Sequence, residues 1–131
     1  PLVRLGQEFT LAPVHAYPWG EDPDLYRRWF RSWSTRLGRF ARIVWSPNVA
    51  YPGSRPVVAY WPGEAYVDIV GLDGYAWNSA MPADIFGPTL AFLRGFTEME
   101  SILVCETGYP RDLGGQRRWV EELRRWAEIE D

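Results

Sequence analysis

The sequence contains no lysine, one cysteine and one histidine among its 131 residues. Its 14 basic residues are therefore all arginines, and they are scattered among 17 acidic residues to give a formal net charge of −3. A nucleic-acid-binding surface requires a basic patch or stripe, so nucleic acid is not an expected partner. Cys105 alone excludes an internal disulfide, and His15 has no second histidine with which to share a metal ion. We expect no metal site.

Long hydrophobic runs are also missing. No apolar stretch approaches the ~20 residues of a membrane-spanning helix, so a membrane is not an expected partner, and no signal peptide is recognisable. A hydrophobic content of 47% nevertheless argues against disorder. The length is sufficient for one domain with its own core.

Aromatic residues are abundant: they make up 16% of the chain, with eight Trp and seven Tyr. A Trp-rich core accounts for some of them. Carbohydrate sites also use flat aromatic rings, because the C–H faces of sugars are apolar while their rims carry hydroxyl groups. Composition alone does not separate these two interpretations.

Strand and helix patterns alternate along the chain. Strands are predicted at 2–8, 40–46, 66–73 and 101–106, and helices at about 22–38, 83–94 and 115–130. The first helix is expected to begin at Asp22-Pro23, where Asp acts as cap and Pro suits the first position. Its apolar face is predicted to pack on the core and comprises Leu25, Trp29, Trp33 and Leu37 at steps of four, with Tyr26 and Phe30 beside them. Trp119 and Trp126 of the last helix are also predicted to face the core. Helices and long connections between strands predict parallel pairing and an α/β class. About four β/α units are present, half the number in a closed barrel.

Two of the predicted strands end on a glutamate. The first ends at Glu8 and the fourth at Glu106, which Gly108 follows closely. Parallel strands of a (β/α) barrel present catalytic groups at their carboxyl ends, and paired carboxylates perform glycoside hydrolysis. Arg4 precedes Glu8 by four residues along the same predicted strand and should point to the same side. Asp73 ends the third strand, and it is either a further acid or a structural residue.

Six segments appear in a familiar order along the chain, namely Val3–Phe9, Tyr17–Gly20, Val44–Asn48, Trp61–Asp68, Val70–Tyr75 and Glu106–Gly108. Together they resemble glycoside hydrolase family 26, whose members include β-mannanases and mixed-linkage β-glucanases. The resemblance runs over almost the whole chain. The chain differs from common members at Thr10, where Asn is usual.

The resemblance implies a partial TIM (β/α)8 barrel, equivalent to strands 4 to 7, with residues 1–131 forming a single incomplete catalytic domain. It implies Glu8 as acid/base and Glu106 as nucleophile, with no metal or organic cofactor. Tyr75 is expected to hydrogen-bond the nucleophile, and Arg4 is hypothesised to help keep Glu106 ionised. The predicted substrate-binding residues are Arg4, Trp19, Trp45, Asn48, Tyr75 and Trp77.

The predicted function is retaining hydrolysis of a β-linked polysaccharide or oligosaccharide such as mannan or β-glucan. Secretion is expected because such polymers lie outside the cell. One alternative is an inert half-barrel that binds glycan weakly. Another is a domain that self-associates or pairs with a complementing half to form the barrel, because a half-barrel leaves two open sheet edges.

Overall fold

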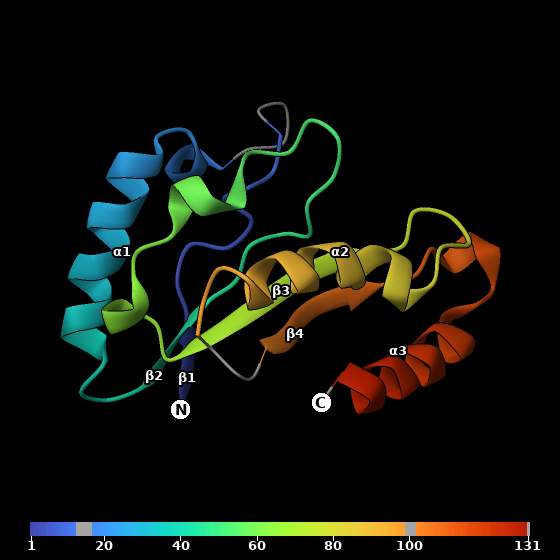
Figure 1. Ribbon diagram of the computed structural model, residues 1–131. Coiled ribbons are helices and arrows are strands. Elements are labelled where there is room, and N and C mark those ends of the chain that lie inside the picture. The colour runs from blue at the N-terminus through green and yellow to red at the C-terminus, as the bar shows by residue number, and fades with distance from the viewer. Residues whose placement is uncertain (13–16, 99–101, 131) are drawn as a thin grey trace.

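The computed structural model describes residues 1–12, 17–98 and 102–130, in which strands and helices alternate (Figure 1). Its main elements are β1 (Leu2–Arg4), α1 (Pro23–Leu37), β2 (Arg42–Trp45), β3 (Ile69–Tyr75), α2 (Pro82–Arg94), β4 (Ile102–Gly108) and α3 (Gln116–Glu130). The strands form one sheet in the order β1-β2-β3-β4, and every neighbouring pair is parallel. Parallel strands in sequential order, alternating with helices, form half of a (β/α)8 barrel.

The first strand is shorter than the pattern predicts. It was expected to reach Glu8 but ends at Arg4, which pairs with Val44 of β2. Gly6 then adopts a φ of +60°, a conformation that suits glycine, and the chain leaves the sheet in a turn. The other three strands overlap their predicted ranges, although β3 and β4 continue to Tyr75 and Gly108.

Helix α1 begins where its cap predicts. The side chain of Asp22 accepts hydrogen bonds from the backbone N–H groups of Asp24 and Leu25, at 2.8 and 3.0 Å. The predicted core face is wrong in part, because Leu25, Trp29 and Trp33 are exposed, whereas Tyr26 and Phe30 beside them are buried as predicted.

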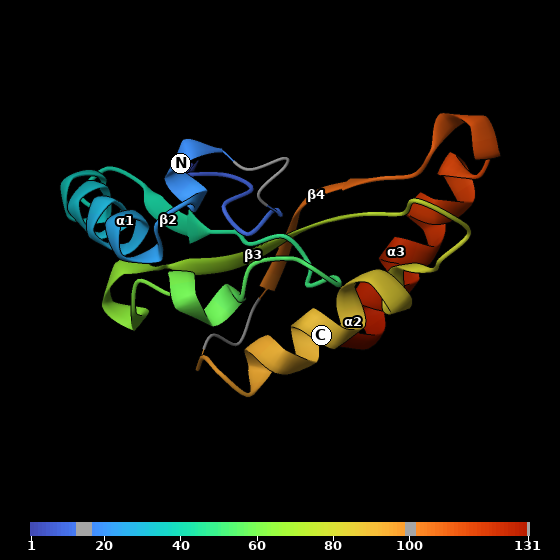
Figure 2. The same cartoon turned by 90° about the horizontal axis from the view of Figure 1, so that it is seen from above.

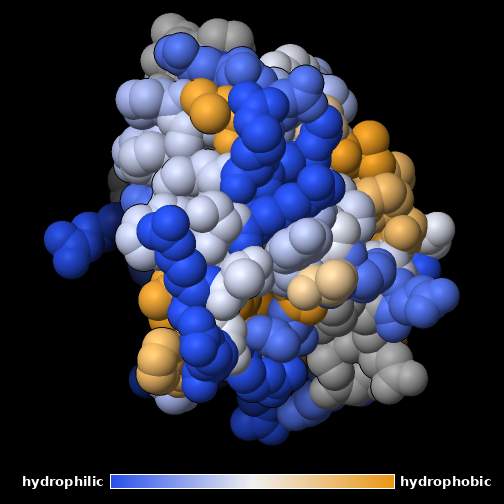
Figure 3. Space-filling view, turned by 90° about the vertical axis from the view of Figure 1, so that its left-hand side faces the viewer, coloured by the Kyte–Doolittle hydropathy of each residue, from blue (hydrophilic) through white to orange (hydrophobic). Residues whose placement is uncertain are grey.

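The adjacent stripe of α1, formed by Tyr26, Phe30 and Ser34, is buried instead. Both stripes repeat every four residues, so periodicity does not decide which one faces the sheet. The face of the molecule that carries α1 is largely hydrophilic, with small hydrophobic patches (Figure 3).

The core on the α1 side is an aromatic cluster. Phe9 packs against Tyr26, Trp45 and Tyr60, with ring centroids 4.4, 5.5 and 5.3 Å away. At the other end of the sheet, α2 packs against β3 and α3 packs against α2 (Figures 1 and 2). Trp119 is buried there and Trp126 stacks on Phe86, as the helical pattern predicts.

The face of the sheet that carries Arg4 and Asp73 is exposed at its two edge strands, β1 and β4. Val70 and Leu72 of β3 point into the core and are buried. Leu2 and Leu103, by contrast, are exposed. Leu2 lies two residues before Arg4, and Leu103 pairs with Gly71, two residues before Asp73, so both share the face that carries these polar side chains. Within the described residues, no helix is both long and apolar enough to span a bilayer.

Candidate active site

The carboxyl ends of the four strands bring together a cluster of charged and polar side chains. Arg4 is the last residue of β1, and Asp73 and Tyr75 lie among the last three residues of β3. Glu106 lies in β4 and pairs with Asp73. Ser46 follows the last residue of β2. Because all four strands are parallel, residues at their carboxyl ends meet at one edge of the sheet.

The guanidinium group of Arg4 connects two carboxylates. Its Nη1 donates to Oδ1 of Asp73 at 2.8 Å, and its Nη2 forms a hydrogen-bonded ion pair with Oε1 of Glu106. The hydroxyl of Tyr75 donates to the second carboxylate oxygen of Glu106, Oε2, at 2.6 Å. Both oxygens of Glu106 therefore have a donor, one of them cationic.

These contacts lower the pKa of Glu106 below its ordinary value. The hydrogen bond from Tyr75 is the largest cause, partial burial opposes it, and the hydrogen bond and positive charge of Arg4 add to the lowering. The same hydrogen bond raises the pKa of Tyr75 to about 12. Glu106 is thus kept ionised, as a carboxylate nucleophile requires.

Asp73 is in a different environment. Its side chain is fully buried, and Ser46 donates to its Oδ1 at 3.0 Å. Its Oδ2 has no hydrogen-bond partner among the described residues. Burial raises the pKa of Asp73 to about 6, against the lowering effects of Arg4 and Ser46, and the charges of Glu106 and Glu8 raise it further. Asp73 is thus a buried member of the cluster, held by Arg4 and Ser46.

Glu8 reaches the site from a turn and not from a strand. It lies four residues beyond the end of β1, at a φ of +55° that is uncommon for a residue with a side chain. The argument that Arg4 and Glu8 point the same way along one strand is therefore wrong. Glu8 is nevertheless close enough to both Asp73 and Tyr75 for its charge to raise their pKa values.

A pocket of about 670 Å³ lies beside this cluster. Polar residues and apolar residues both contribute to its wall, and they come from the Glu8 turn, the loop after β2, the end of β3 and the start of α2. The lining residues are Glu8, Leu11, Asn48, Val49, Ala50, Tyr51, Asp73, Gly74, Tyr75, Trp77, Asp84 and Ile85. Its size is that of a small-molecule or oligosaccharide site.

The structure separates the four remaining residues predicted to bind substrate. Asn48 and Trp77 line the pocket, and Trp77 is 84% exposed. Asn48 is held by Thr10, whose hydroxyl accepts a hydrogen bond from the Asn48 N–H at 3.0 Å. Trp45 is 0% exposed and packs against Phe9 and Trp61, so the prediction that it contacts sugar is wrong.

Trp19 lies apart from the pocket lining. Its ring stacks on Tyr17 at a centroid distance of 4.6 Å, and its Nε1 donates to the carbonyl of Gln7 at 2.7 Å. The indole thereby supports the turn that leads to Glu8. It remains a predicted substrate contact.

Several pocket and cluster residues were not predicted. Ser46 and Tyr51 both lie in the connection after β2, where strand-end position was a usable signal for Ser46. Leu11, Asp84 and Ile85 carried no such signal, because only folding brings the Glu8 turn and the start of α2 to one pocket. Within the described part of the chain, no three His, Cys, Asp or Glu residues form a metal-binding group, and His15 lies outside that part.

Comparison with protein families finds a match over more than half of the chain. The family model described as glycosyl hydrolase family 26 matches residues 14–103. The matched range includes α1, β2, β3 and α2, whereas Glu8 lies before it and Glu106 after it. A comparison with curated proteins finds no match.

Proposed function

Because this chain belongs to glycosyl hydrolase family 26, we propose that it serves retaining hydrolysis of a β-linked polysaccharide, mannan or β-glucan. Glu106 is the nucleophile and Glu8 is the acid/base. The observation that carries the proposal is the paired support of Glu106 by Tyr75 and Arg4 beside a pocket that Glu8 also lines. We further propose that the protein acts outside the cell, where such polymers lie.

The proposed reaction has two steps. A carboxylate oxygen of Glu106 attacks the anomeric carbon while the glycosidic C–O bond breaks, and Glu8 gives its proton to the departing oxygen. Glu8, now a carboxylate, then removes a proton from water, which displaces Glu106 from the sugar and restores both groups. Arg4 and Tyr75 contribute by holding Glu106 ionised and oriented before the attack.

A trapping experiment tests this mechanism. A slow-turnover fluorinated β-mannoside or β-glucoside should leave a covalent sugar on the peptide that contains Glu106, detected by mass spectrometry. Glu106→Ala should abolish the adduct, whereas the control Glu121→Ala, on the exposed face of α3, should retain it. An adduct that persists in Glu106→Ala would refute the nucleophile assignment.

Glycan binding without turnover is the second candidate function. It is favoured by the exposure of Leu2 and Leu103, which lie on the edge strands β1 and β4 and on the same face of the sheet as Arg4 and Asp73. Because these edges are open to water, the site is less enclosed than a closed barrel would make it. Release of reducing sugar from mannan and mixed-linkage glucan, compared with pull-down by the same polymers, separates the two functions. Binding with no release supports the second.

A further inference from the structure

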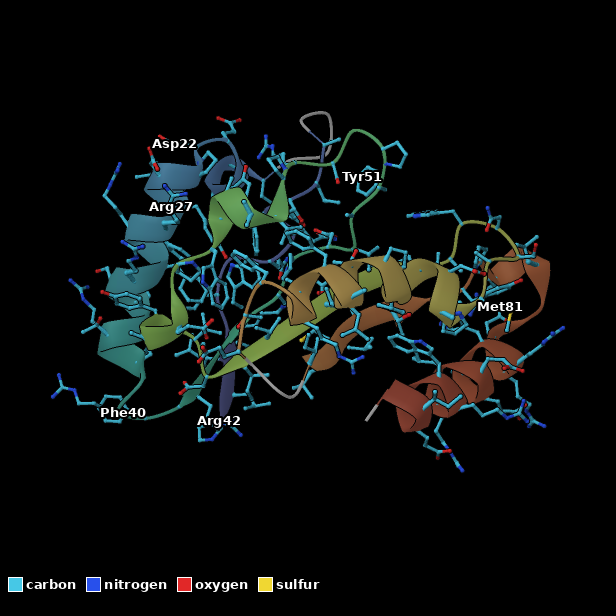
Figure 4. All side chains as sticks on the ribbon, in the orientation of Figure 1. Asp22, Arg27, Phe40, Arg42, Tyr51 and Met81 are labelled. Atoms are coloured by element: carbon cyan, nitrogen blue, oxygen red, sulfur yellow. The ribbon has the colours of Figure 1, made fainter. Side chains whose placement is uncertain are left out.

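Tyr51 forms part of the pocket wall but belongs to neither the catalytic cluster nor the predicted sugar contacts. It lies six residues beyond the end of β2, on a loop at the opposite end of the molecule from Phe40 and Arg42 (Figure 4). Arg42 begins β2, so Tyr51 is on the carboxyl side of the sheet. Leu11, Val49 and Ala50 line the same pocket.

The ring of Tyr51 is held in place at both ends. Its hydroxyl accepts a hydrogen bond from the backbone N–H of Ala12 at 2.8 Å. Its own backbone N–H donates to the hydroxyl of Ser54 at 3.1 Å, and the N–H of Ser54 donates back to the Tyr51 carbonyl at 2.9 Å. A ring fixed before ligand arrives loses little conformational entropy on binding.

The loop of Tyr51 is also tied to the turn that carries Glu8. The N–H of Arg55 donates to the carbonyl of Thr10 at 3.0 Å, and the N–H of Leu11 donates to the carbonyl of Glu8 at 3.3 Å. Together with the Ala12 contact, these bonds set the position of Tyr51 relative to Glu8. Trp77, in contrast, has one ring neighbour, Tyr75, at 6.3 Å within the described residues, and projects far into solvent.

We propose that Tyr51 is the aromatic wall of a sugar-binding subsite, where its ring stacks on the C–H face of one pyranose unit of a β-linked glycan. The proposal rests on the proposed function. A preorganised aromatic ring that is 37% exposed, beside the apolar residues Leu11, Val49 and Ala50, matches the apolar face of a neutral sugar. Tyr51 binds and positions a sugar unit and takes no part in bond cleavage.

The test measures binding by the full chain with two probes, β-manno-oligosaccharides and mixed-linkage β-gluco-oligosaccharides, by calorimetry. Tyr51→Ala, which removes the ring, should weaken the affinity for the bound probe by about 5- to 10-fold. Tyr51→Phe keeps the ring and should stay within about 3-fold of the unsubstituted chain, because it loses the hydrogen bond from Ala12 but keeps the stacking surface. The control Phe40→Ala removes an exposed ring at the far end of the molecule and should leave affinity unchanged.

A second measurement covers the case in which Tyr51→Ala does not fold. In the chain labelled with fluorotyrosine, the resonance missing from Tyr51→Phe identifies Tyr51, and it should shift when the probe is added. An unshifted resonance, or equal affinity of Tyr51→Ala and the unsubstituted chain, overturns the subsite while the proposed function stands. Failure of the unsubstituted chain to bind either probe overturns both.

Discussion

The hydroxyl of Tyr75 is the donor whose loss should most clearly change the chemistry of Glu106. In Tyr75→Phe, Oε2 of Glu106 loses its 2.6 Å hydrogen bond, so the pKa of Glu106 should rise. Because Glu106, as the proposed nucleophile, must be ionised, the acid limb of the pH–rate profile should move to higher pH. The value of kcat/KM should fall by roughly 10- to 100-fold, the usual worth of a hydrogen bond to a charged group.

The measurement is hydrolysis or inactivation by the trapping reagent over a range of pH. Tyr66→Phe is the matched control, because Tyr66 lies in a 3-10 helix outside the pocket lining. An acid limb that stays in place in Tyr75→Phe would mean that this hydroxyl does not set the ionisation of Glu106.

Asp73 should make the stability of the fold depend on pH. Its pKa rises from 3.8 to about 6 on folding, so between these values the folded protein holds more protons at Asp73 than the unfolded chain. The free energy of unfolding should therefore fall as pH rises from about 4 to 6, by about 3 kcal/mol for this group. Asp73→Asn, which cannot ionise but still offers an oxygen to Arg4 and Ser46, should lack this decline.

Denaturant unfolding at several pH values between 4 and 7 measures the difference. Glu121→Gln, which removes an exposed carboxylate on α3, serves as control and should keep the wild-type slope. Equal slopes for Asp73→Asn and the unsubstituted chain would show that burial does not raise the pKa of Asp73.

Helix α1 offers a direct test of which stripe supports the core. Phe30 is fully buried, with its ring centroid 5.9 Å from that of Tyr26, whereas Trp33, three residues later, is 40% exposed. Phe30→Ala should lower the free energy of unfolding by about 3–5 kcal/mol, because it leaves a cavity. Trp33→Ala should cost about 1 kcal/mol or less. Chemical denaturation of both variants gives the comparison, and a larger loss for Trp33→Ala would reverse the burial pattern.

The connection between β2 and β3 shows how an element without regular periodicity shapes the site. Pro- and Gly-rich sequence predicts a loop there, and the structure adds two short 3-10 helices, Val57–Tyr60 and Glu64–Tyr66. Tyr60 is buried, and its hydroxyl donates to the carbonyl of Gly20 at 2.6 Å. This connection therefore completes the core under α1 while its first residues reach the pocket.

The molecule as a whole should prefer uncharged glycans. Its net charge is −3, and Glu8, Asp73 and Asp84 all line the pocket. A polyuronate of similar length should bind at least about ten-fold more weakly than a neutral mannan or glucan, since each close like-charge pair costs about 1 kcal/mol. Added salt should narrow the difference by screening the repulsion. Affinity electrophoresis at two salt concentrations measures it, and equal binding of both polymers at low salt would contradict it.

The sequence alone determined the parts of this protein that depend on neighbouring residues. Short apolar runs predict β2, β3 and β4, the Asp22-Pro23 pair predicts the start of α1, and the alternation predicts a parallel sheet. The position of Glu106 near the end of a predicted strand also identifies it as a candidate site residue, because the carboxyl ends of parallel strands lie together at one end of the sheet. These features need only local periodicity and capping.

Tertiary structure alone decided what depends on register and packing. It ends β1 at Arg4 and turns the stripe of α1 that contains Tyr26 and Phe30 toward the core. Trp45, which was predicted to contact sugar, is buried. It also places Arg4 between Asp73 and Glu106, which are 69 and 102 residues further along the chain. The physical reason is that strand pairing and side-chain packing join distant residues, and no local pattern records which of two equivalent faces they will use.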